Sequence, residues 1–286
     1  MTPPLIVIGM HRSGTSLVTD MLESLGLFTG VARDPNREAW FFLRLNDWLL
    51  EQSGGNWEHP APISYLLEHQ PLRALALEYI RTIMRTPHVV AFLGWQKYLR
   101  CRSLERLDIP WGWKDPRNTF TLPLWLELFP EAKVIHICRH GVDVARSLQQ
   151  RQQEISNMDA ARAAFDRRKP LCWLRLKRSG FIAQVRCSSL EGGFTLWEEY
   201  MREARRHVKT LGARAVEIRY EDFLKEPRAG LAALAQFCNL AAPPARMDAA
   251  IAHVRPARAC AYQADPALRA FAAAHAAELA AFGYHA

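Results

Sequence analysis

The stretch LIVIGMHRSGTS at residues 5–16 constrains the fold more than any other part of this sequence. It begins with branched apolar residues, which are typical of a strand buried on both faces, as in a parallel sheet. Apolar residues then recur at helical spacing from Leu17 to Leu25, and Gly26 is suited to end that helix. The chain therefore opens as a strand, a glycine-containing loop and a helix.

The same unit recurs further along the chain. Strands are predicted at 134–138 (VIHIC), at 215–220 (AVEIRY) and, as a short strand end, at 111–115; helices are predicted at 122–129, at 195–211 and after Pro227. Strands that alternate with helices predict an α/β fold in three layers, with a central parallel sheet flanked by helices. A chain of 286 residues needs only one core, so we expect a single domain over residues 1–286.

The segment 151–190 does not follow this pattern. It carries nine Lys or Arg residues against three Asp or Glu, without a clear period. We interpret it as a basic insertion or lid within the domain, with a solvated helical face as the alternative. The whole chain has a net charge of +8, which favours an acidic partner such as nucleic acid, a membrane surface or a phosphorylated ligand.

Cysteine usage and hydropathy indicate the cellular compartment of the protein. The six cysteines form no C-x-x-C pair, so neither a zinc site nor a thioredoxin-type redox pair is indicated. The apolar run near the N-terminus lacks a basic region before it, and no run approaches the roughly 18 apolar residues that a membrane span needs. We therefore expect a cytoplasmic protein with reduced thiols and no membrane span.

The loop after the first strand has the composition of an anion site. A loop that leads from a strand into a helix gathers free backbone N–H groups at the positive end of the helix dipole. Gly9 and Gly14 allow tight turning and a close approach of the backbone to a ligand. Hydroxyl donors and one permanently charged cation complete the set: Ser13, Thr15, Ser16 and Arg12.

The loop differs from the nucleoside triphosphate motif G-x-x-x-x-G-K-[ST] at one decisive position. Gly9 and Gly14 have the right spacing, but Thr15 stands where the lysine that reaches the outer phosphates would be. This argues against an ATP or GTP enzyme. A P-loop nucleotide kinase or another phosphate-binding protein remains an alternative, as does a non-catalytic nucleic-acid-binding protein that uses segment 151–190, although no recognised nucleic-acid module is present.

The run Arg12-Ser13-Gly14-Thr15-Ser16 resembles the 5′-phosphosulfate loop of the sulfotransferases that use 3′-phosphoadenosine-5′-phosphosulfate (PAPS). The form with arginine is most similar to the bacterial and tyrosylprotein members. The resemblance implies a P-loop-like fold and in-line transfer of a sulfonate from PAPS to an acceptor hydroxyl. It further implies adenosine 3′,5′-bisphosphate as product and neither a metal nor a nucleic-acid partner. The acceptor stays open among a glycan, a glycolipid, an acidic natural product and a protein tyrosine, and the resemblance favours a carbohydrate or small metabolite.

Three further matches support this resemblance. Arg139 ends a predicted strand, and Ser147 follows in the next helix; in the family this pair holds the 3′-phosphate of PAPS. Physically, open α/β sheets bind ligands at the carboxyl ends of their strands, where Arg139 stands. Lys114, in WKDPR, corresponds to the lysine that neutralises the transferring sulfonate, and Tyr220, in RYEDF, to a tyrosine near the nucleotide. Without the resemblance, Arg139 and Ser147 would be an ion-pair residue and a helix residue, and Tyr220 a core tyrosine.

The acceptor hydroxyl needs a general base, while Arg12 and Lys114 would hold the sulfonate and the departing phosphate. The segment 33–60 resembles the substrate-facing segment of bacterial members, and Glu38 fits the acidic position best. The alternative for Glu38 is a first-turn helix residue without a catalytic role. The rival bases are Asp34, Asp47 and His59. Asn46, Asp47 and Trp57 are expected to shape the structure or the acceptor pocket.

Overall fold

The computed structural model describes residues 2–167, 185–252, 254–255 and 258–286, with the side chains of 158–167 outside that description. The contacts divide the chain into two compact units: Met1–Arg139 with Tyr200–Cys260, and His140–Glu199 with Ala261–Ala286. The single domain expected over residues 1–286 stays a prediction.

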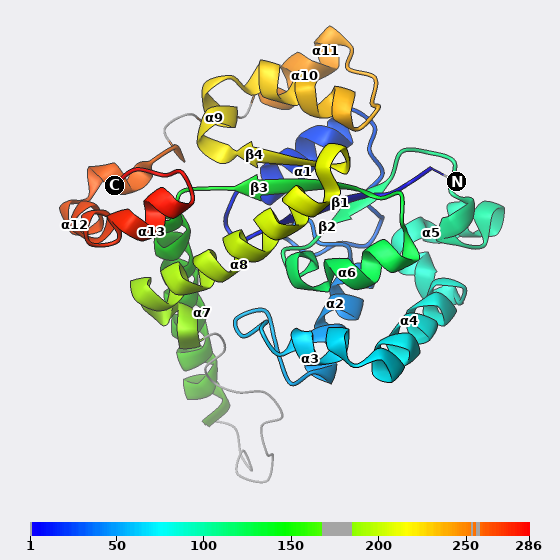
Figure 1. Ribbon diagram of the computed structural model, residues 1–286, viewed down its shortest axis with the longest axis horizontal. Coiled ribbons are helices and arrows are strands. Elements are labelled where there is room, and N and C mark those ends of the chain that lie inside the picture. The colour runs from blue at the N-terminus through cyan, green and yellow to red at the C-terminus, as the bar shows by residue number, and fades with distance from the viewer. Residues whose placement is uncertain (1, 168–184, 253, 256–257) are drawn as a thin grey trace. The chain divides into compact units, whose positions relative to one another are not determined.

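A four-stranded parallel sheet forms the centre of the first unit (Figure 1). Its strands are β1 (Leu5–Gly9), β2 (Gly112–Lys114), β3 (Lys133–Cys138) and β4 (Ala215–Arg219), in the order β2-β1-β3-β4. The parallel sheet and all four predicted strands are confirmed. Because the strands are parallel, their carboxyl ends lie at one edge, with Gly9 opposite Ile137 and Cys138 opposite Arg219.

The helices of the first unit connect and cover these strands. They are α1 (Thr15–Ser24), α2 (Trp40–Gln52), α3 (Ile63–Glu68), α4 (Gln70–Met84), α5 (Val90–Cys101), α6 (Asn118–Leu128), α9 (Tyr220–Lys225), α10 (Pro227–Phe237), α11 (Pro244–Ile251) and the part of α8 (Leu190–Leu211) from Tyr200 onward. As predicted, α1 ends just before Gly26, whose φ of 105° suits glycine, and α10 begins at Pro227, where no backbone N–H is needed.

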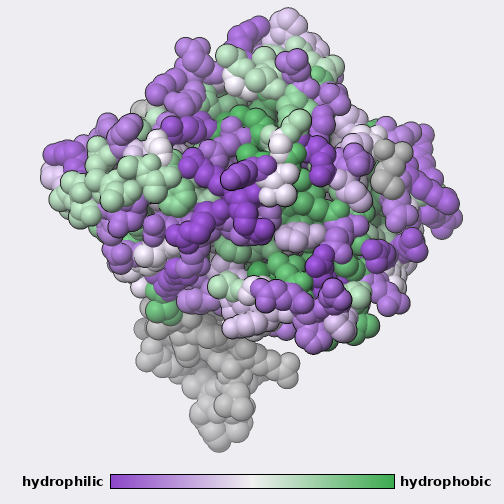
Figure 2. Space-filling model, in the orientation of Figure 1, coloured by the Kyte–Doolittle hydropathy of each residue, from purple (hydrophilic) through white to green (hydrophobic). Residues whose placement is uncertain are grey.

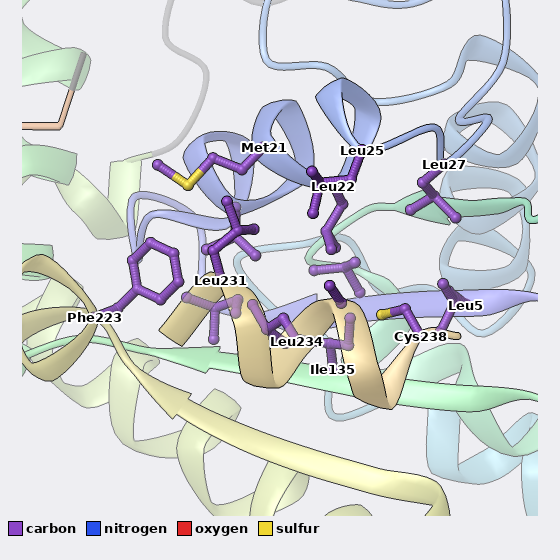
Figure 3. Packing of buried hydrophobic residues seen from close by; sticks show 14 of the residues in the cluster. Leu5, Met21, Leu22, Leu25, Leu27, Ile135, Phe223, Leu231, Leu234 and Cys238 are labelled. Carbon is purple, nitrogen blue, oxygen red and sulfur yellow. The ribbon is translucent and has the colours of Figure 1, made fainter. Parts of the chain in front are cut away.

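Apolar side chains on one face of the sheet pack against α1, α10 and α11 (Figure 3). The strands contribute Leu5, Val7, Ile135 and Ile137, all nearly inaccessible to solvent. Side chains that alternate with these point to the opposite face. There His136 contacts Glu217 at 3.0 Å, and Arg205 of α8 pairs with the same carboxylate. Helices thus cover both faces, which confirms the predicted three-layer α/β class.

The second unit contains α7 (Gly141–Arg167), the first half of α8, α12 (Pro266–Ala274) and α13 (Ala276–Ala281). Residues 151–167 continue α7, whereas 168–184 lie outside the described residues, so the proposed insertion or lid at 151–190 stays a prediction. Hydrophilic residues cover most of the face drawn in Figure 2, where the alanine-rich α12 and α13 are pale green. None of the helices in the described parts of the chain combines the length and hydropathy needed to cross a membrane.

Candidate active site

The loop between β1 and α1 is shaped by close contacts at its start. A side chain at Gly9 would lie 2.3 Å from the carbonyl oxygen of Ile137 on the neighbouring strand, and the φ of Gly9 is +136°. The buried Ser13 donates its hydroxyl to the Met10 carbonyl at 2.7 Å, and Ser16 donates its hydroxyl to Asn36 at 2.8 Å. Two of the three predicted hydroxyl donors therefore also brace the loop itself and the segment that follows α1.

The first turn of α1 has the character of an anion site. Its N-cap, Gly14, provides no side-chain hydrogen bond, and no acidic residue lies in the first turn. The N–H groups of that turn therefore have no cap from the N-cap side chain, and the helix dipole adds positive potential at the same point. Thr15 is buried at this turn, whereas the side chain of Arg12 is exposed to solvent.

Tyr220 forms the wall of the loop opposite α1. It follows β4 directly, is almost fully buried, and its ring would lie 2.3 Å from a Cβ atom placed on Gly14. The guanidinium carbon of Arg139 lies 5.0 Å from the centre of the same ring, within cation–π range. Tyr220 thus contacts the glycine of one anion loop and the cation of the other, although it also fills the role of a buried core tyrosine.

We expect Gly14→Ala to destabilise the protein and to impair ligand binding at the loop. The φ of Gly14 is +96°, and its new methyl group would collide with the Tyr220 ring. Gly26→Ala is the matched control, because Gly26 has a φ of +105° and nothing within 4 Å of its added Cβ atom. Urea unfolding should show a loss of about 1–3 kcal/mol for each from backbone strain, and a further loss for Gly14→Ala alone. Equal losses would contradict the packing of Tyr220 against Gly14.

Arg139 stands at the end of β3 and reaches back to the first loop. It donates from Nη1 to the Arg12 carbonyl at 3.3 Å and from Nη2 to the Arg258 carbonyl at 3.0 Å. The two predicted anion loops therefore meet at one edge of the sheet. Ser147 lies in α7, in the second unit, so its pairing with Arg139 stays a prediction. The sequence also places a basic cluster, His253, Arg255 and Arg258, after α11, and His253 lies outside the described residues.

Lys114 and Glu38 form a buried ion pair next to this edge. Lys114 is the last residue of β2, is 1% exposed, and donates from Nζ to Oε1 of Glu38 at 3.0 Å. Arg117 donates to the other oxygen of Glu38, Oε2, at 3.1 Å. Arg117 also pairs with Asp115 and with Asp47, so it joins three carboxylates. The site therefore combines two cations with two deeply buried carboxylates, of which Glu38 alone contacts both cations.

A network of buried amides holds this cluster in place. Asn46 on α2 donates to Asp115 and to Asn118, at 2.8 Å in each case, and its own oxygen accepts from Thr121 and Trp125. Buried polar groups that are fully hydrogen-bonded fix a unique geometry. The sequence predicted only that Asn46 shapes the structure or the acceptor pocket; the direct contact of Arg117 with Glu38 is seen in the structure alone.

Burial and neighbouring charges shift the acidity of these groups. Burial, reinforced by the nearby Asp115, raises the pKa of Glu38 above its ordinary value of 4.5, although Lys114 and Arg117 act in the opposite direction. Burial likewise raises the pKa of Asp47. For Arg117, burial acts to lower the pKa, but the carboxylates around it raise the value above that of an ordinary arginine. A carboxylate that takes up a proton more readily than usual is suited to general-base chemistry.

The structure separates Glu38 from its predicted rivals. Glu38 precedes α2, which begins at Trp40, so the alternative of a first-turn helix residue is wrong. Asp34 closes a turn, accepting from the Glu38 N–H at 2.7 Å. Asp47 lies at the exposed end of the same cluster, and His59 is an exposed turn residue that pairs with Asn56. Only Glu38 is fully buried against both cations.

Sequence reasoning missed the aromatic contact beside the loop. His11 is buried with its ring 4.5 Å from that of Trp57, whose carbonyl accepts a hydrogen bond from Tyr200 at 2.9 Å. Thr119 on α6 also accepts a hydrogen bond from the Gly9 N–H at 3.1 Å. The two hydrogen bonds join residues more than a hundred positions apart, and no local pattern in the sequence indicates any of these contacts.

The family model described as "Sulfotransferase family" matches residues 3–244 of this chain. No curated protein matches the sequence.

Several solved structures are similar to this one. The sulfotransferase domain from the curacin biosynthetic pathway is 17% identical, with a TM-score of 0.48, over 86% of this chain and 77% of that one. Sulfotransferase STF9 from Mycobacterium avium is 15% identical, with a TM-score of 0.49, over 99% of this chain and 77% of that one. The sulfotransferase domain from the Synechococcus PCC 7002 olefin synthase is 20% identical, with a TM-score of 0.46, over 93% and 85%.

Proposed function

The chain belongs to the sulfotransferase family, and from that membership we propose that it transfers the sulfonate of PAPS to an acceptor hydroxyl by in-line displacement. The observation that carries the proposal is the buried Lys114–Glu38–Arg117 cluster at the carboxyl edge of the sheet, beside an uncapped helix start. The cluster places the Lys114 ammonium, a cation for a sulfonate oxygen, beside a carboxylate that can take a hydroxyl proton, and these are the two groups that this reaction requires.

The residues around the loop fit the two anionic ends of PAPS. The first-turn N–H groups of α1, the Thr15 hydroxyl and the exposed Arg12 would bind the phosphosulfate, while Ser13 and Ser16 keep the loop in shape. Arg139, with Ser147, would bind the 3′-phosphate. The hydrogen bond from Arg139 to the Arg12 carbonyl supports one continuous nucleotide site, and Tyr220 would flank it.

The chemistry asks little covalent work of the protein. Glu38 would take the proton of the acceptor hydroxyl. At the same time the acceptor oxygen forms a bond to sulfur, and the bond from sulfur to the bridging phosphate oxygen breaks. That phosphate leaves as adenosine 3′,5′-bisphosphate with the bonding electron pair. Lys114 and Arg12 would stabilise the charge on the sulfonate and on the departing phosphate. Arg117 holds Glu38 from the other side and so acts as a positioning residue.

We propose a carbohydrate or small metabolite as the acceptor, because the family resemblance favours one. Transfer of radiolabelled sulfonate from PAPS into a panel of glycans, phenols, lipids and small hydroxylated metabolites would identify it. Incorporation into a glycan or small metabolite is the expected result, and labelling of a protein tyrosine alone would contradict this choice.

Nucleotide protection against heat tests the proposal without knowledge of the acceptor. We expect adenosine 3′,5′-bisphosphate to raise the melting temperature in the absence of magnesium, because the ligand binds only the folded state. Protection by Mg-ATP but not by the bisphosphate would favour a P-loop kinase instead. Salt-sensitive binding of DNA or RNA without any response to the bisphosphate would favour a nucleic-acid-binding protein.

Arg139→Ala should remove the preference for a nucleotide with a 3′-phosphate. Wild-type protein is expected to bind adenosine 3′,5′-bisphosphate more tightly than adenosine 5′-monophosphate, because a charge-assisted hydrogen bond contributes about 1.5–3 kcal/mol. In the variant, titration calorimetry should show the bisphosphate weakened by about tenfold or more and the monophosphate nearly unchanged. Ser147→Ala should act in the same direction. Equal weakening of both nucleotides would contradict a 3′-phosphate role for Arg139.

A further inference from the structure

The exposed large hydrophobic side chains of this protein are concentrated in one part of the chain. Among the described residues there are nine of them, and all but Val185 fall between positions 31 and 99: Val31, Trp40, Tyr65, Leu72, Leu75, Tyr79, Trp95 and Leu99. Single exposed apolar residues need no explanation, but a group of large ones marks an interaction surface. None of them takes part in the Lys114–Glu38–Arg117 cluster.

Printed contacts and helical spacing link these residues into one surface. On α4, Leu75 and Tyr79 are four residues apart and share a side, and the Tyr79 ring lies 4.5 Å from that of Trp48 on α2. On α2, Trp48, Arg44 and Trp40 recur every four residues, and the Arg44 guanidinium stands 5.7 Å from the centre of the Trp40 ring. The surface therefore runs from α4 along α2.

The same surface continues onto α5. The Trp40 N–H donates to the Ala32 carbonyl, and the neighbouring Val31 lies against Gly94, where the helix is kinked. After that kink, Trp95 and Leu99 are four residues apart and are 65% and 61% exposed. We define the aromatic face as Trp40, Trp48, Leu75, Tyr79, Trp95 and Leu99.

The α5 end of the aromatic face is positively charged. Arg100 and Arg102 are exposed at the end of α5, whereas Lys97 stands over the Phe28 ring, and the sequence from Val90 to Leu104 contains no aspartate or glutamate. Arg102 stands 6.0 Å from the centre of the Tyr98 ring, and Arg44 adds a cation on α2. Tryptophan and leucine on one side of a helix, flanked by lysine and arginine, is the pattern of helices that lie in a membrane interface.

We propose that the aromatic face binds the surface of an anionic lipid bilayer. Trp and Tyr rings favour the headgroup region of a bilayer, and the cations would pair with anionic headgroups. Leu75 and Leu99 supply aliphatic surface that matches lipid acyl chains but not a glycan or a nucleic acid. A second copy of this chain would bring the α5 cations together, so self-association is disfavoured electrostatically. Asp47, on the same exposed side of α2 between Arg44 and Trp48, pairs with Arg117, so the face borders the candidate active site.

Vesicle sedimentation with the full-length protein tests this proposal. We expect the protein to sediment with vesicles of phosphatidylcholine containing a third of phosphatidylglycerol, and much less with pure phosphatidylcholine. The double variant Trp95→Ala/Leu99→Ala should lower the partition coefficient at least about tenfold by loss of inserted apolar area. Arg100→Gln/Arg102→Gln should lower it by a similar factor on anionic vesicles only, since each cation near the surface contributes about a fivefold effect.

Val185→Ala is the matched control, because Val185 is an equally exposed apolar residue outside the aromatic face. It should bind vesicles as the wild type does, and all variants should keep the wild-type melting temperature, since the replaced side chains are exposed. Absence of wild-type sedimentation with anionic vesicles would overturn the proposal. Vesicle binding reduced as much in Val185→Ala as in Trp95→Ala/Leu99→Ala would also overturn it. The same holds for a wild type that binds no vesicles but forms a concentration-dependent dimer that Trp95→Ala/Leu99→Ala abolishes. Sulfonate transfer is not measured in this experiment, so its outcome is independent of the proposed reaction.

Discussion

Lys114→Met should lower the turnover of sulfonate transfer by at least about a hundredfold, the usual cost of removing one preorganised donor from a transition-state oxyanion. Methionine retains much of the volume of lysine but carries no charge. The expected loss follows from the position of Lys114 at the end of β2, 3.0 Å from Glu38 and almost fully buried. Turnover is measured with radiolabelled PAPS, and folding by urea unfolding in parallel.

Two further variants separate a loss of catalysis from a loss of stability. Removing one partner of a buried ion pair destabilises a protein, whereas removing both is often nearly neutral, so Lys114→Met/Glu38→Gln should recover stability but not activity. Lys133→Met is the matched lysine control, because Lys133 begins β3 at the opposite end of the strands and donates to the Phe237 carbonyl. Near-wild-type turnover in Lys114→Met would exclude a role for this lysine at the sulfonate.

Glu38→Gln should reduce turnover by about 10²–10⁴-fold, the typical contribution of a general base, while adenosine 3′,5′-bisphosphate still protects the variant against heat. Glutamine keeps the shape of the side chain and can still accept a hydrogen bond, but it cannot take a proton. Wild-type-like turnover would remove Glu38 from the role of base. Loss of nucleotide protection together with turnover would instead assign Glu38 to holding the nucleotide site.

The pH profile gives an independent test of the same group. Glu38 acts as a base only when it is ionised, and burial raises its pKa above 4.5. The kcat/KM of the wild type should therefore fall as the pH drops through a value above 4.5, and Glu38→Gln should lose this acid limb.

Asp47→Asn is the control for the pH profile, because it removes another carboxylate partner of Arg117 without touching Glu38. It should retain the limb and much of the turnover, since Asp47 is partly exposed and such pairs contribute little. Disappearance of the limb in Asp47→Asn would assign the titration to Asp47.

Local patterns in the sequence were sufficient for the framework. The branched apolar run at β1 predicted a buried strand of a parallel sheet, because such a run cannot face water on either side, and the segments at β3 and β4 predicted further strands. The loop from Gly9 to Ser16 predicted an anion site, because its glycines, hydroxyls and arginine are neighbours in the chain. Parallel strands then place Lys114, Arg139 and Tyr220 at one edge, since Lys114 ends β2 and the other two directly follow β3 and β4.

Only the tertiary structure decided how these residues meet. Glu38 and Lys114 are 76 residues apart, and their pairing depends on how the segment before α2 packs on the end of β2. The same packing buries Glu38 and raises its pKa, a property that no spacing in the sequence contains. Gly14 is required partly because the Tyr220 ring, at the start of α9 after β4, fills the space next to it. The sequence by itself predicted the anion loop and indicated the family, because each motif consists of residues close together in the chain. Which carboxylate faces the cations was decided by long-range packing alone.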